Sequence, residues 1–450
     1  MGKPTDMRVL EVAAATEQFD YRVPIKFGGR VLRDVTLLHV TAKVETRDGR
    51  TGEGFGSMPL GNVWAWPSGT LAADETLAAM LALGRRVARE ANDYEGLGHP
   101  LEIAHDLSAI YAPAADSVAR ELNLAEPIPR LAQLVAASPV EAALFDAHGK
   151  AIGRNAYDLL GEAYVNRHLG EYLGDEFAGE YLDRYTLRTP KPRMPLYHLI
   201  GALDPLAAGD LAQRVDDGLP ETLPEWIAAD GLTHMKIKLA GDDLSWDVGR
   251  VTSVERVAAE AQAARGCRRW YYSADFNEKC ENVEYVLEFL ARVRELSAEA
   301  FERLQYLEQP THRDLRANPE NRMHAAAAVK PVVIDESLVD FDSLLLSREL
   351  GYSGVALKAC KGHGEALRMG AAAQKYGMFL CVQDLTCPGA SFLHSASLAA
   401  RIPTVAAIEG NGRQYCPAAN AGWAERFPTM FDITDGTLGT GVLTSPGLGF

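Results

Sequence analysis

Two lysines separated by a single residue, Lys236 and Lys238, are the side chains most suited to proton transfer in this sequence. If residues 233–239 form a strand, both point to the same face, because successive side chains of a strand alternate. Repulsion between the two ammonium groups and burial in a sheet should lower the pKa of at least one of them below about 10.4. Such a lysine can act as a base. The alternative is that both reach solvent at a strand end.

Three acidic residues, Asp275, Glu308 and Asp335, are candidate ligands of a divalent cation. Three carboxylates in one partly buried cleft cannot all stay ionised without a counter-charge. Mg²⁺ prefers oxygen ligands and keeps open positions for water and a substrate oxygen, and Mn²⁺ is a chemically similar substitute. Each acid taken alone could instead form a salt bridge or cap a loop.

One ionisable residue follows each of seven short apolar runs, at intervals of 23 to 37 residues. These residues are Lys238, Asp275, Glu308, Asp335, Lys358, Asp384 and Glu409. A β/α unit of a closed eight-stranded barrel occupies roughly 30 residues, and the C-terminal ends of its strands meet on one face, where the active site is built. We therefore expect these side chains to meet.

Lys238 and Lys358 follow the second and sixth expected strands, which lie on opposite sides of such a barrel. Two bases that face each other across a substrate can remove a proton from one face of a carbon and deliver one to the other. A metal ion that binds the substrate carboxylate would stabilise the enediolate formed when the α-proton leaves. The set predicts chemistry at a carbon next to a carboxylate.

Eight apolar or β-branched runs that alternate with helical patterns predict the scaffold of these residues. The runs are 194–201, 234–239, 270–274, 305–307, 331–334, 354–357, 378–382 and 405–408. Their number favours an α/β fold of the (β/α)8 type, a modified TIM barrel, over residues 194–430.

The first part of the chain, residues 1–160, predicts an α+β capping domain. An Asp48-Gly49 pair between two alternating runs indicates an antiparallel hairpin. Residues 70–91 have helical spacing, and Ser138-Pro139 is typical of a helix start, with serine as the N-cap.

Four further segments complete the expected organisation. Residues 17–30 and 56–69 are expected to be loops, the second of which carries Trp64, a residue type that in loops often contacts ligands. Residues 161–193 are expected to connect the two domains, and residues 431–450 to close onto the capping domain.

The composition limits the partners. A formal net charge of −16 and a sequence pI near 5.2 disfavour nucleic acids and anionic membranes, which both require basic patches. The six cysteines form no C-x-x-C pair, and the N-terminus carries no apolar signal segment, so we expect a cytoplasmic protein with reduced thiols. We expect a small carboxylate as substrate and a homo-oligomeric assembly.

Five ordered motifs resemble those of the enolase superfamily, most closely its muconate-lactonizing-enzyme-like subgroup. They are residues 235–238 (MKIK), 275–277 (DFN), 308–310 (EQP), 335–337 (DES) and 357–362 (LKACKG). The resemblance implies a capping domain on a barrel, and Asp275, Glu308 and Asp335 as Mg²⁺ ligands. It also implies Lys238 and Lys358 as the acid/base pair.

The resemblance implies roles for further residues around this set. Lys236 would be an electrostatic helper near the substrate carboxylate, and Glu409 would hydrogen-bond that carboxylate. Asp384 would be a substrate contact or a structural acid. Asn277, Glu336 and Lys361, which belong to the same motifs, are further candidate substrate contacts.

Several reactions remain open for such a site. Lysines on both faces favour racemisation or epimerisation, while a muconate-type cycloisomerisation, an acid-sugar-type dehydration and a non-catalytic binding barrel are the alternatives. The sequence has Gln383-Asp384 where the mandelate racemase subgroup has a histidine, which disfavours a histidine base. Residues 409–411 (EGN) do not match the Asp-x-Asp-like motif of dipeptide epimerases, so a standard dipeptide substrate is disfavoured.

Overall fold

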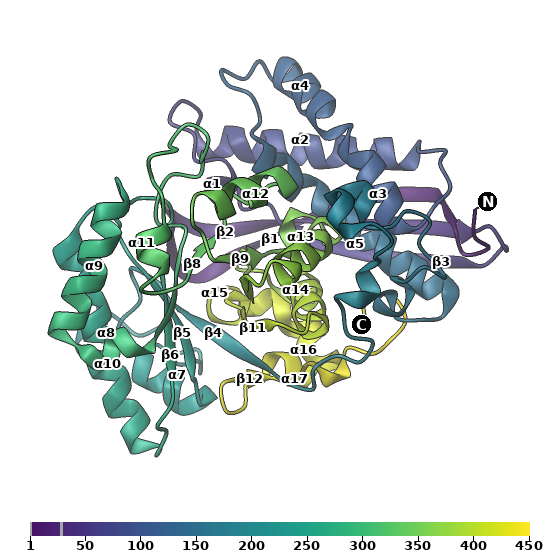
Figure 1. Ribbon diagram of the computed structural model, residues 1–450. Helices are drawn as coiled ribbons and strands as arrows, with labels where there is room; N and C mark the ends of the chain where they lie inside the picture. The colour runs from purple at the N-terminus through teal and green to yellow at the C-terminus, as the bar shows by residue number, and fades with distance from the viewer. Residues whose placement is uncertain (1, 28–29) are drawn as a thin grey trace.

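The computed structural model describes residues 2–27 and 30–450, and its larger part is a closed barrel (Figure 1). The barrel strands are β4 (Met194–Ile200), β5 (His234–Lys238), β6 (Tyr271–Asp275), β7 (Leu304–Glu308), β8 (Val332–Ile334), β9 (Gly354–Leu357), β10 (Phe379–Val382) and β11 (Val405–Glu409). They pair in parallel in chain order, and β11 pairs with β4 to close the sheet. The predicted eight-stranded barrel is confirmed.

Helices cover the outside of the barrel. They are α7 (Leu223–Asp230), α8 (Leu244–Ala264), α9 (Val283–Leu296), α10 (Ala298–Arg303), α11 (His324–Ala327), α12 (Phe341–Glu349), α13 (His363–Lys375) and α14 (Gly389–Arg401). In α9, Val286, Leu290 and Val293 recur at helical spacing and are buried, so the apolar stripe faces the sheet. The barrel interior is filled by a separate buried cluster that includes Tyr197 and Tyr306. The barrel is therefore a packed core and not a pore.

The N-terminal cap is a three-stranded antiparallel sheet with helices on it. Its strands are β1 (Met7–Phe27), β2 (Arg30–Thr46) and β3 (Thr51–Pro59), and its helices are α1 (Asn62–Ala65), α2 (Ala73–Asn92), α3 (Pro100–Ser108), α4 (Tyr111–Glu121) and α5 (Arg130–Ile152). Helix α5 lies directly on β3 at three glycines, Gly52, Gly54 and Gly56. A Cβ at Gly54 would lie 2.2 Å from the Ala143 carbonyl oxygen, and one at Gly56 would lie 1.9 Å from that of Pro139. Only glycine permits this approach.

The segment 17–30 is not the loop that its proline and glycines predicted. β1 continues to Phe27 and pairs with β2, while Gly28 and Gly29 lie outside the described residues. Within this segment the pairing is interrupted between Asp20 and Ile25, and Pro24 lies in that interruption. A proline there removes no hydrogen bond from the ladder, which is why the strand tolerates it.

The predicted helix start at Ser138-Pro139 is also wrong. α5 begins at Arg130, and Pro139 lies inside it. Proline has no N–H to donate to the carbonyl four residues earlier, that of Val135. The Ser138 hydroxyl donates to this carbonyl instead, at 2.9 Å, so the serine repairs the helix and does not cap it.

The last residues of the chain lie against the cap. They follow α15 (Gly412–Tyr415), α16 (Ala421–Arg426), α17 (Pro428–Phe431) and β12 (Thr437–Leu438), the last of which pairs with β4. The Leu448 amide donates to Asp146 of α5 at 3.0 Å, and Asn155 donates to the Ser445 carbonyl at 2.9 Å. Between cap and barrel, the segment that contains the short helix α6 (Gly170–Leu173) packs on α13.

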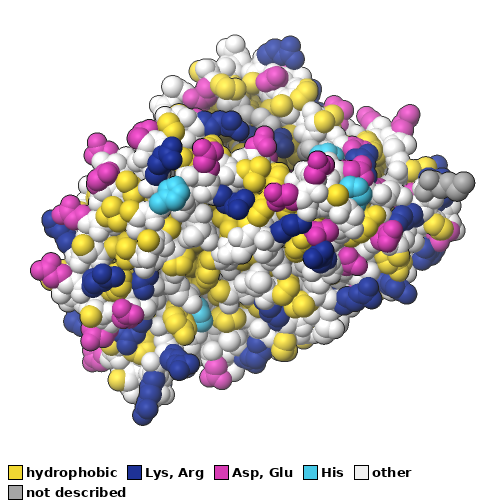
Figure 2. Space-filling view, viewed as in Figure 1, with side chains coloured by type: hydrophobic (Ala, Val, Ile, Leu, Met, Phe, Trp, Pro, Cys, Tyr) yellow, Lys and Arg dark blue, Asp and Glu magenta, His cyan; other side chains and the backbone are white. Residues whose placement is uncertain are grey.

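The outer surface carries both signs of charge. On the face in Figure 2, acidic and basic side chains are interspersed and do not gather by sign. Among the described residues, none of the helices combines the length and apolarity that crossing a membrane requires.

A buried acid of the cap, Glu141 of α5, gives the fold a pH-dependent stability. Its carboxylate accepts the Gly364 amide at 3.1 Å, and burial raises its pKa from 4.5 to about 7 although Arg368 opposes the rise. The folded protein holds this proton more tightly than the unfolded chain. The stabilisation is therefore complete below pH 4.5 and is lost as the pH rises through about 7.

We expect Glu141→Gln, which stays neutral, to remove this dependence. Urea unfolding at pH 5 and pH 8 measures the effect. Between these pH values the free energy of unfolding of the wild-type protein should fall by up to about 3 kcal/mol through this group, and that of the variant should not. Glu90→Gln, at an exposed glutamate, is the matched control and should behave as wild type. Parallel pH profiles of wild type and Glu141→Gln would contradict the assignment.

Candidate active site

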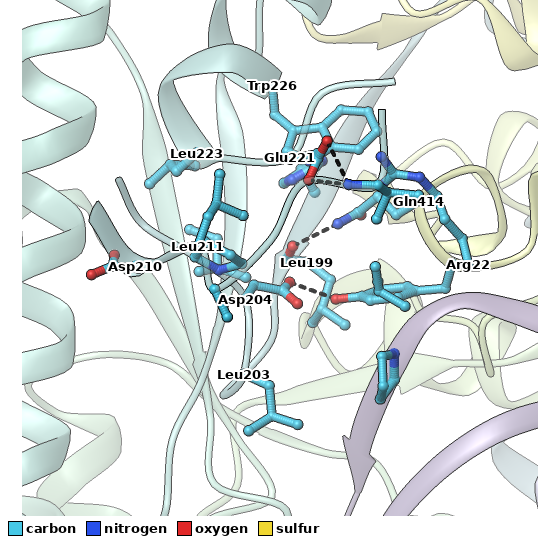
Figure 3. A pocket seen from close by; sticks show the side chains of 18 of the residues that line it. Arg22, Leu199, Leu203, Asp204, Asp210, Leu211, Glu221, Leu223, Trp226 and Gln414 are labelled. Atoms are coloured by element: carbon cyan, nitrogen blue, oxygen red, sulfur yellow. Dashed lines mark hydrogen bonds between the residues drawn. The ribbon is translucent and has the colours of Figure 1, made fainter. Parts of the chain in front are cut away.

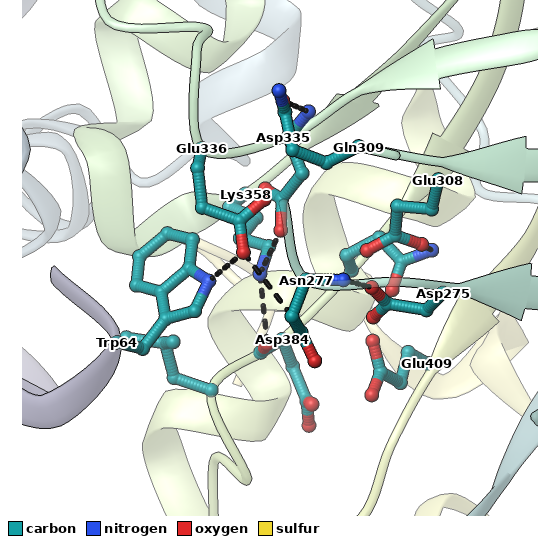
Figure 4. Close-up of polar contacts among 12 residues, drawn as sticks. Trp64, Asp275, Asn277, Glu308, Gln309, Asp335, Glu336, Lys358, Asp384 and Glu409 are labelled. Carbon is teal, nitrogen blue, oxygen red and sulfur yellow. Dashed lines mark hydrogen bonds and ion pairs between the residues drawn. The ribbon is translucent and has the colours of Figure 1, made fainter. Parts of the chain in front are cut away.

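All eleven residues that the sequence singled out lie at the C-terminal ends of the barrel strands or directly after them, and Figure 4 draws several of them. Hydrogen bonds and ion pairs join them in two groups, one around Lys236 and one around Asp335. Asn411 links the two groups, because its amide donates to both Glu409 and Asp384. In Figure 4, Asp275, Glu308 and Glu409 lie on one side of the site, and Lys358 lies with Asp335 on the other.

Lys236 is the centre of the first group. Its Nζ lies 2.7 Å from Glu308 and 3.0 Å from both Asp275 and Glu409, and only 1% of the residue is exposed. Burial alone would lower its pKa, but the surrounding carboxylates outweigh burial and hold the pKa well above its ordinary value. The lowered pKa expected from Lys–Lys repulsion is therefore wrong for Lys236, because acids from neighbouring strands reach it.

Lys238, the last residue of β5, bonds to the end of β6 and to the residues that follow it. It is opposite Asp275 in the β5–β6 register, donates to that carboxylate, and donates to Asn277 Oδ1 at 2.9 Å. The Asn277 amide nitrogen in turn donates to Glu336 at 3.1 Å. Asn277 adopts a left-handed backbone with φ of 43°, which directs the chain back over the strand end.

Lys358, at the end of β9, approaches the acids from the other side. Its Nζ lies 2.8 Å from Asp335 and 3.3 Å from the Asp384 carbonyl oxygen, while Lys361 lies 3.1 Å from Asp335. Burial lowers the pKa of Lys358, but Asp335 outweighs burial and the net pKa is raised. For Lys361, burial dominates and the pKa is lowered.

Burial and the charged neighbours shift the pKa values of these carboxylates in different directions. Burial raises the pKa of Asp275, but Lys236 and Lys238 lower it further than burial raises it. Burial, followed by the nearby Asp275, holds the pKa of Glu308 well above its usual range. Burial also raises the pKa of Glu336 and of Asp384, each to about 7. Neighbouring acids therefore have pKa values that differ from one another, as in sites that transfer protons.

The cap contributes one side chain directly to this network. Trp64 of α1 is 7% exposed and donates its indole N–H to Glu336 at 2.8 Å, and Lys358 Nζ lies 4.0 Å from the indole ring centre. Arg313, on the loop after β7, donates to the Trp64 carbonyl at 3.0 Å. Trp64 is therefore fixed to the barrel through both its side chain and its backbone.

Residues 219–450, more than half of the chain, match a family model described as enolase C-terminal domain-like. The chain belongs to the enolase superfamily. The resemblance drawn from the five motifs is thereby confirmed. No curated protein sequence matches the chain.

Solved structures of the mandelate racemase and muconate lactonizing enzyme group share the fold over nearly the whole chain. One is a muconate lactonizing enzyme from Pseudomonas fluorescens complexed with muconolactone, at 18% identity and a TM-score of 0.60, covering 98% of this chain and 96% of that chain. A dipeptide epimerase from Enterococcus faecalis V583, complexed with Mg and the dipeptide L-Leu-L-Tyr, has 16% identity and a TM-score of 0.62, covering 98% and 99%. A racemase from Streptomyces coelicolor A3(2) with bound magnesium has 17% identity and a TM-score of 0.56, covering 98% and 96%.

The donor set of this superfamily member suits a hard divalent cation. Asp275, Glu308 and Asp335 are at most 1% exposed, lie at or directly after the ends of three successive strands and offer only carboxylate oxygens. As the described side chains lie, no group of three or more His, Cys, Asp or Glu residues is arranged to hold a metal ion. Lysine ammonium groups instead contact the carboxylate oxygens. A cation that binds these oxygens must displace the ammonium groups. Lys236 would then lose the attraction of the carboxylates that raises its pKa.

Three neutral residues of the network, Gln383, Gln309 and Asn411, were not among the predicted site residues. Gln383 accepts a hydrogen bond from Lys236 and donates to Glu308 at 2.8 Å, so it orients both. The Gln309 side chain accepts the Asp335 amide at 2.9 Å, and Asn411 donates to Glu409 at 2.7 Å. Their positions in the sequence were the available signal. Gln309 and Asn411 lie one and two residues after the acids that end β7 and β11, and Gln383 lies directly before Asp384.

The space around the site is divided into separate cavities. The pocket between Lys238, Lys358 and Trp64 measures only about 10 Å³, which is about the room of one water molecule. A cavity of about 530 Å³ adjoins Lys238 and is lined by Lys26 of β1, and one of about 230 Å³ adjoins Trp64 and Arg313. Entry of a substrate between the lysines therefore requires the cap side chains to move.

Proposed function

We propose that this chain is a Mg²⁺-dependent racemase or epimerase of a small carboxylate, which abstracts the proton next to the carboxylate. One observation carries the proposal. Lys238 ends β5 and Lys358 follows β9, and these strands are four apart in a closed eight-stranded sheet and so lie opposite each other. Two lysines that approach from opposite sides can serve the two faces of one carbon.

The other residues take the following roles. Asp275, Glu308 and Asp335 would hold Mg²⁺, which would supply the positive charge that a carboxylate substrate needs as its α-proton leaves. Lys236 neutralises the carboxylates around it. Glu409, Asp384, Asn277, Glu336 and Lys361 would contact the substrate. Magnesium in the dipeptide epimerase and the racemase supports this metal for a shared fold.

The cap, residues 1–160, would select the substrate in this proposal. Lys26 of β1 and Trp64 of α1 each line a cavity beside the lysines, so the two cap segments that contain them border the space a substrate would occupy. The small carboxylate class agrees with muconolactone and L-Leu-L-Tyr, the ligands of two structures that share the fold.

Hydrogen exchange in D₂O tests the reaction. The chain with Mg²⁺ is incubated with N-acyl amino acids, dipeptides and hydroxy acids, and each compound is followed by mass spectrometry and chiral chromatography. We expect deuterium at the α-carbon with inversion of configuration for one of these classes. Loss of water would establish a dehydratase instead, and ring closure without a change of mass would establish a cycloisomerase. Mg²⁺ binding without exchange in any compound would contradict the proposal for these substrates.

A further inference from the structure

A second cavity lies beside the barrel (Figure 3). It measures about 370 Å³ and is lined by residues of β1, the end of β4, residues 203–226 and α15. None of the eleven candidate site residues lines it. It reaches the surface, because its lining residues Leu203 and Val215 are 52% and 43% exposed. A volume of this size is within the usual range of small-molecule sites.

Much of the cavity wall is apolar. The apolar lining residues include Leu199, Ile200, Leu203, Leu211, Leu223 and Trp226. Leu223 and Trp226 belong to α7 and are buried, so this helix gives the cavity a fixed apolar side. Such a wall binds the hydrocarbon part of a small molecule, because contact with the wall removes that part from water.

The charged groups of the lining are mainly acidic. They are three carboxylates, Asp204, Asp210 and Glu221, and one guanidinium, Arg22. Arg22 is neutralised from outside the lining, because it donates to both carboxylate oxygens of Asp217, to one of them at 2.8 Å. Glu221 lies 3.8 Å from Arg214, which also lies outside the lining and contacts Glu225 more closely, at 2.6 Å. The lining therefore carries a net negative charge.

Asp204 is the carboxylate best placed to hold a cation. Its Oδ2 accepts the Gly201 amide at 2.7 Å and the Tyr415 hydroxyl, and these two bonds fix the group among the lining side chains (Figure 3). Its Oδ1 is accessible and accepts no hydrogen bond from the described residues. Arg250 donates to the backbone carbonyl of Asp204 at 3.1 Å and not to its carboxylate. Burial raises the pKa of Asp204 further than Arg250 lowers it, so the anion lacks a close counter-charge.

His198 of β4 adds a second open polar atom to the lining. The residue is 2% exposed, and burial, followed by the charge of Arg413, holds the pKa of its imidazole well below the ordinary value. The ring is therefore neutral and supplies no counter-charge for the acids. Its Nδ1 is closed off, whereas its Nε2 is accessible and has no hydrogen-bond partner among the described residues.

We propose that this cavity binds a small organic cation, a protonated amine on an apolar body. The ammonium group donates to Oδ1 of Asp204, and a charge-assisted hydrogen bond of this kind is stronger than a neutral one. The apolar body lies against the leucines and Trp226. An anion of the same size is repelled by the acids of the lining. The inference goes beyond the proposed reaction and does not depend on it.

Three probes of similar size test the proposal on the full chain: benzylamine, benzyl alcohol and benzoate. Dissociation constants are measured by ligand-observed NMR titration at neutral pH, where benzylamine is protonated. Benzylamine should bind about 10- to 100-fold more tightly than benzyl alcohol, the effect of one charge-assisted hydrogen bond, and benzoate should not bind in the cavity. Failure of benzylamine to bind, or equal affinity for benzylamine and benzyl alcohol, would overturn the proposal.

Asp204→Asn separates the charge of the site from its shape. It should reduce the affinity for benzylamine to that for benzyl alcohol, and retained binding of benzyl alcohol shows that the cavity of the variant is intact. Asp342→Asn, at an exposed aspartate of α12, changes the net charge by the same amount and should leave both affinities as in wild type. Benzylamine affinity that is unchanged in Asp204→Asn would overturn the assignment of the ammonium partner.

A second pair of variants locates the binding. Leu211→Trp fills the cavity and should abolish binding of benzylamine and benzyl alcohol, whereas Leu345→Trp, at an exposed leucine of α12, should leave both unchanged. Probe binding that survives Leu211→Trp would place the ligand elsewhere and contradict the proposal.

Discussion

Lys238→Ala is expected to abolish α-hydrogen exchange from one configuration of the substrate and to spare exchange from the other. Lys238 and Lys358 reach the acid cluster from opposite strands, so each can take a proton from only one face of the α-carbon. A positioned acid or base contributes about 10²- to 10⁴-fold to a rate, and we expect a loss of that size for one configuration. Deuterium incorporation into each pure enantiomer, followed by mass spectrometry, measures it.

Lys358→Ala should give the mirror result, and either variant should stop net inversion. Lys279→Ala is the matched control, because Lys279 is exposed and lines the cavity next to Lys238 without belonging to the network. It should retain exchange from both configurations. Equal loss of exchange from both enantiomers in Lys238→Ala would rule out two independent faces and favour a single base, as in a dehydration or a cycloisomerisation.

The barrel and the meeting of its charged residues could be predicted from sequence, because short apolar runs mark the strands and charged residues stand at the ends of these runs. Asp275 and Glu308 are each the last residue of their strand, and Lys358 is the first residue after its strand. Short apolar runs mark the strands, and closure of the sheet then brings distant strand ends together. Periodicity and order alone contain this information.

The charge state of Lys236 could not be predicted in the same way. Its neighbour Lys238 is visible in the sequence, but its partners Glu308 and Glu409 are 72 and 173 residues away. The field at a buried group depends on which carboxylates lie within a few ångströms, and this is set by strand register. Register is a property of the closed sheet, and no local pattern reports it.

Two errors in the cap have a related cause. Pro24 and Pro139 are local signals for a loop and a helix start, and both are overruled by neighbours. The interruption in the β1–β2 pairing removes the cost of Pro24, and the Ser138 hydroxyl removes part of the cost of Pro139. Each compensation depends on one geometric detail, so propensity alone gave a loop in place of a strand at Pro24 and a wrong helix start at Pro139.

Removal of one proposed metal ligand should destabilise the folded chain both with and without Mg²⁺, for two different reasons. In wild type, Mg²⁺ at 100 times its dissociation constant should stabilise the folded chain by about 2.7 kcal/mol. Asp275→Asn should abolish this stabilisation and also weaken the Mg²⁺-free protein, because Lys236 and Lys238 lose a buried partner. Thermal unfolding with Mg²⁺ and with EDTA measures both effects. Glu308→Gln and Asp335→Asn should abolish the Mg²⁺ effect too.

Asp384→Asn is the matched control for these ligands. Asp384 is a buried acid at the same mouth of the barrel, 5% exposed, and its carboxylate accepts backbone amides of Thr386 and Cys387 rather than a lysine. Its replacement should leave the Mg²⁺ stabilisation as in wild type. If Asp275→Asn kept the full Mg²⁺ stabilisation while Asp384→Asn lost it, the cation would bind among the acids after β10 and β11, and the lysine-paired carboxylates would serve only to neutralise the lysines.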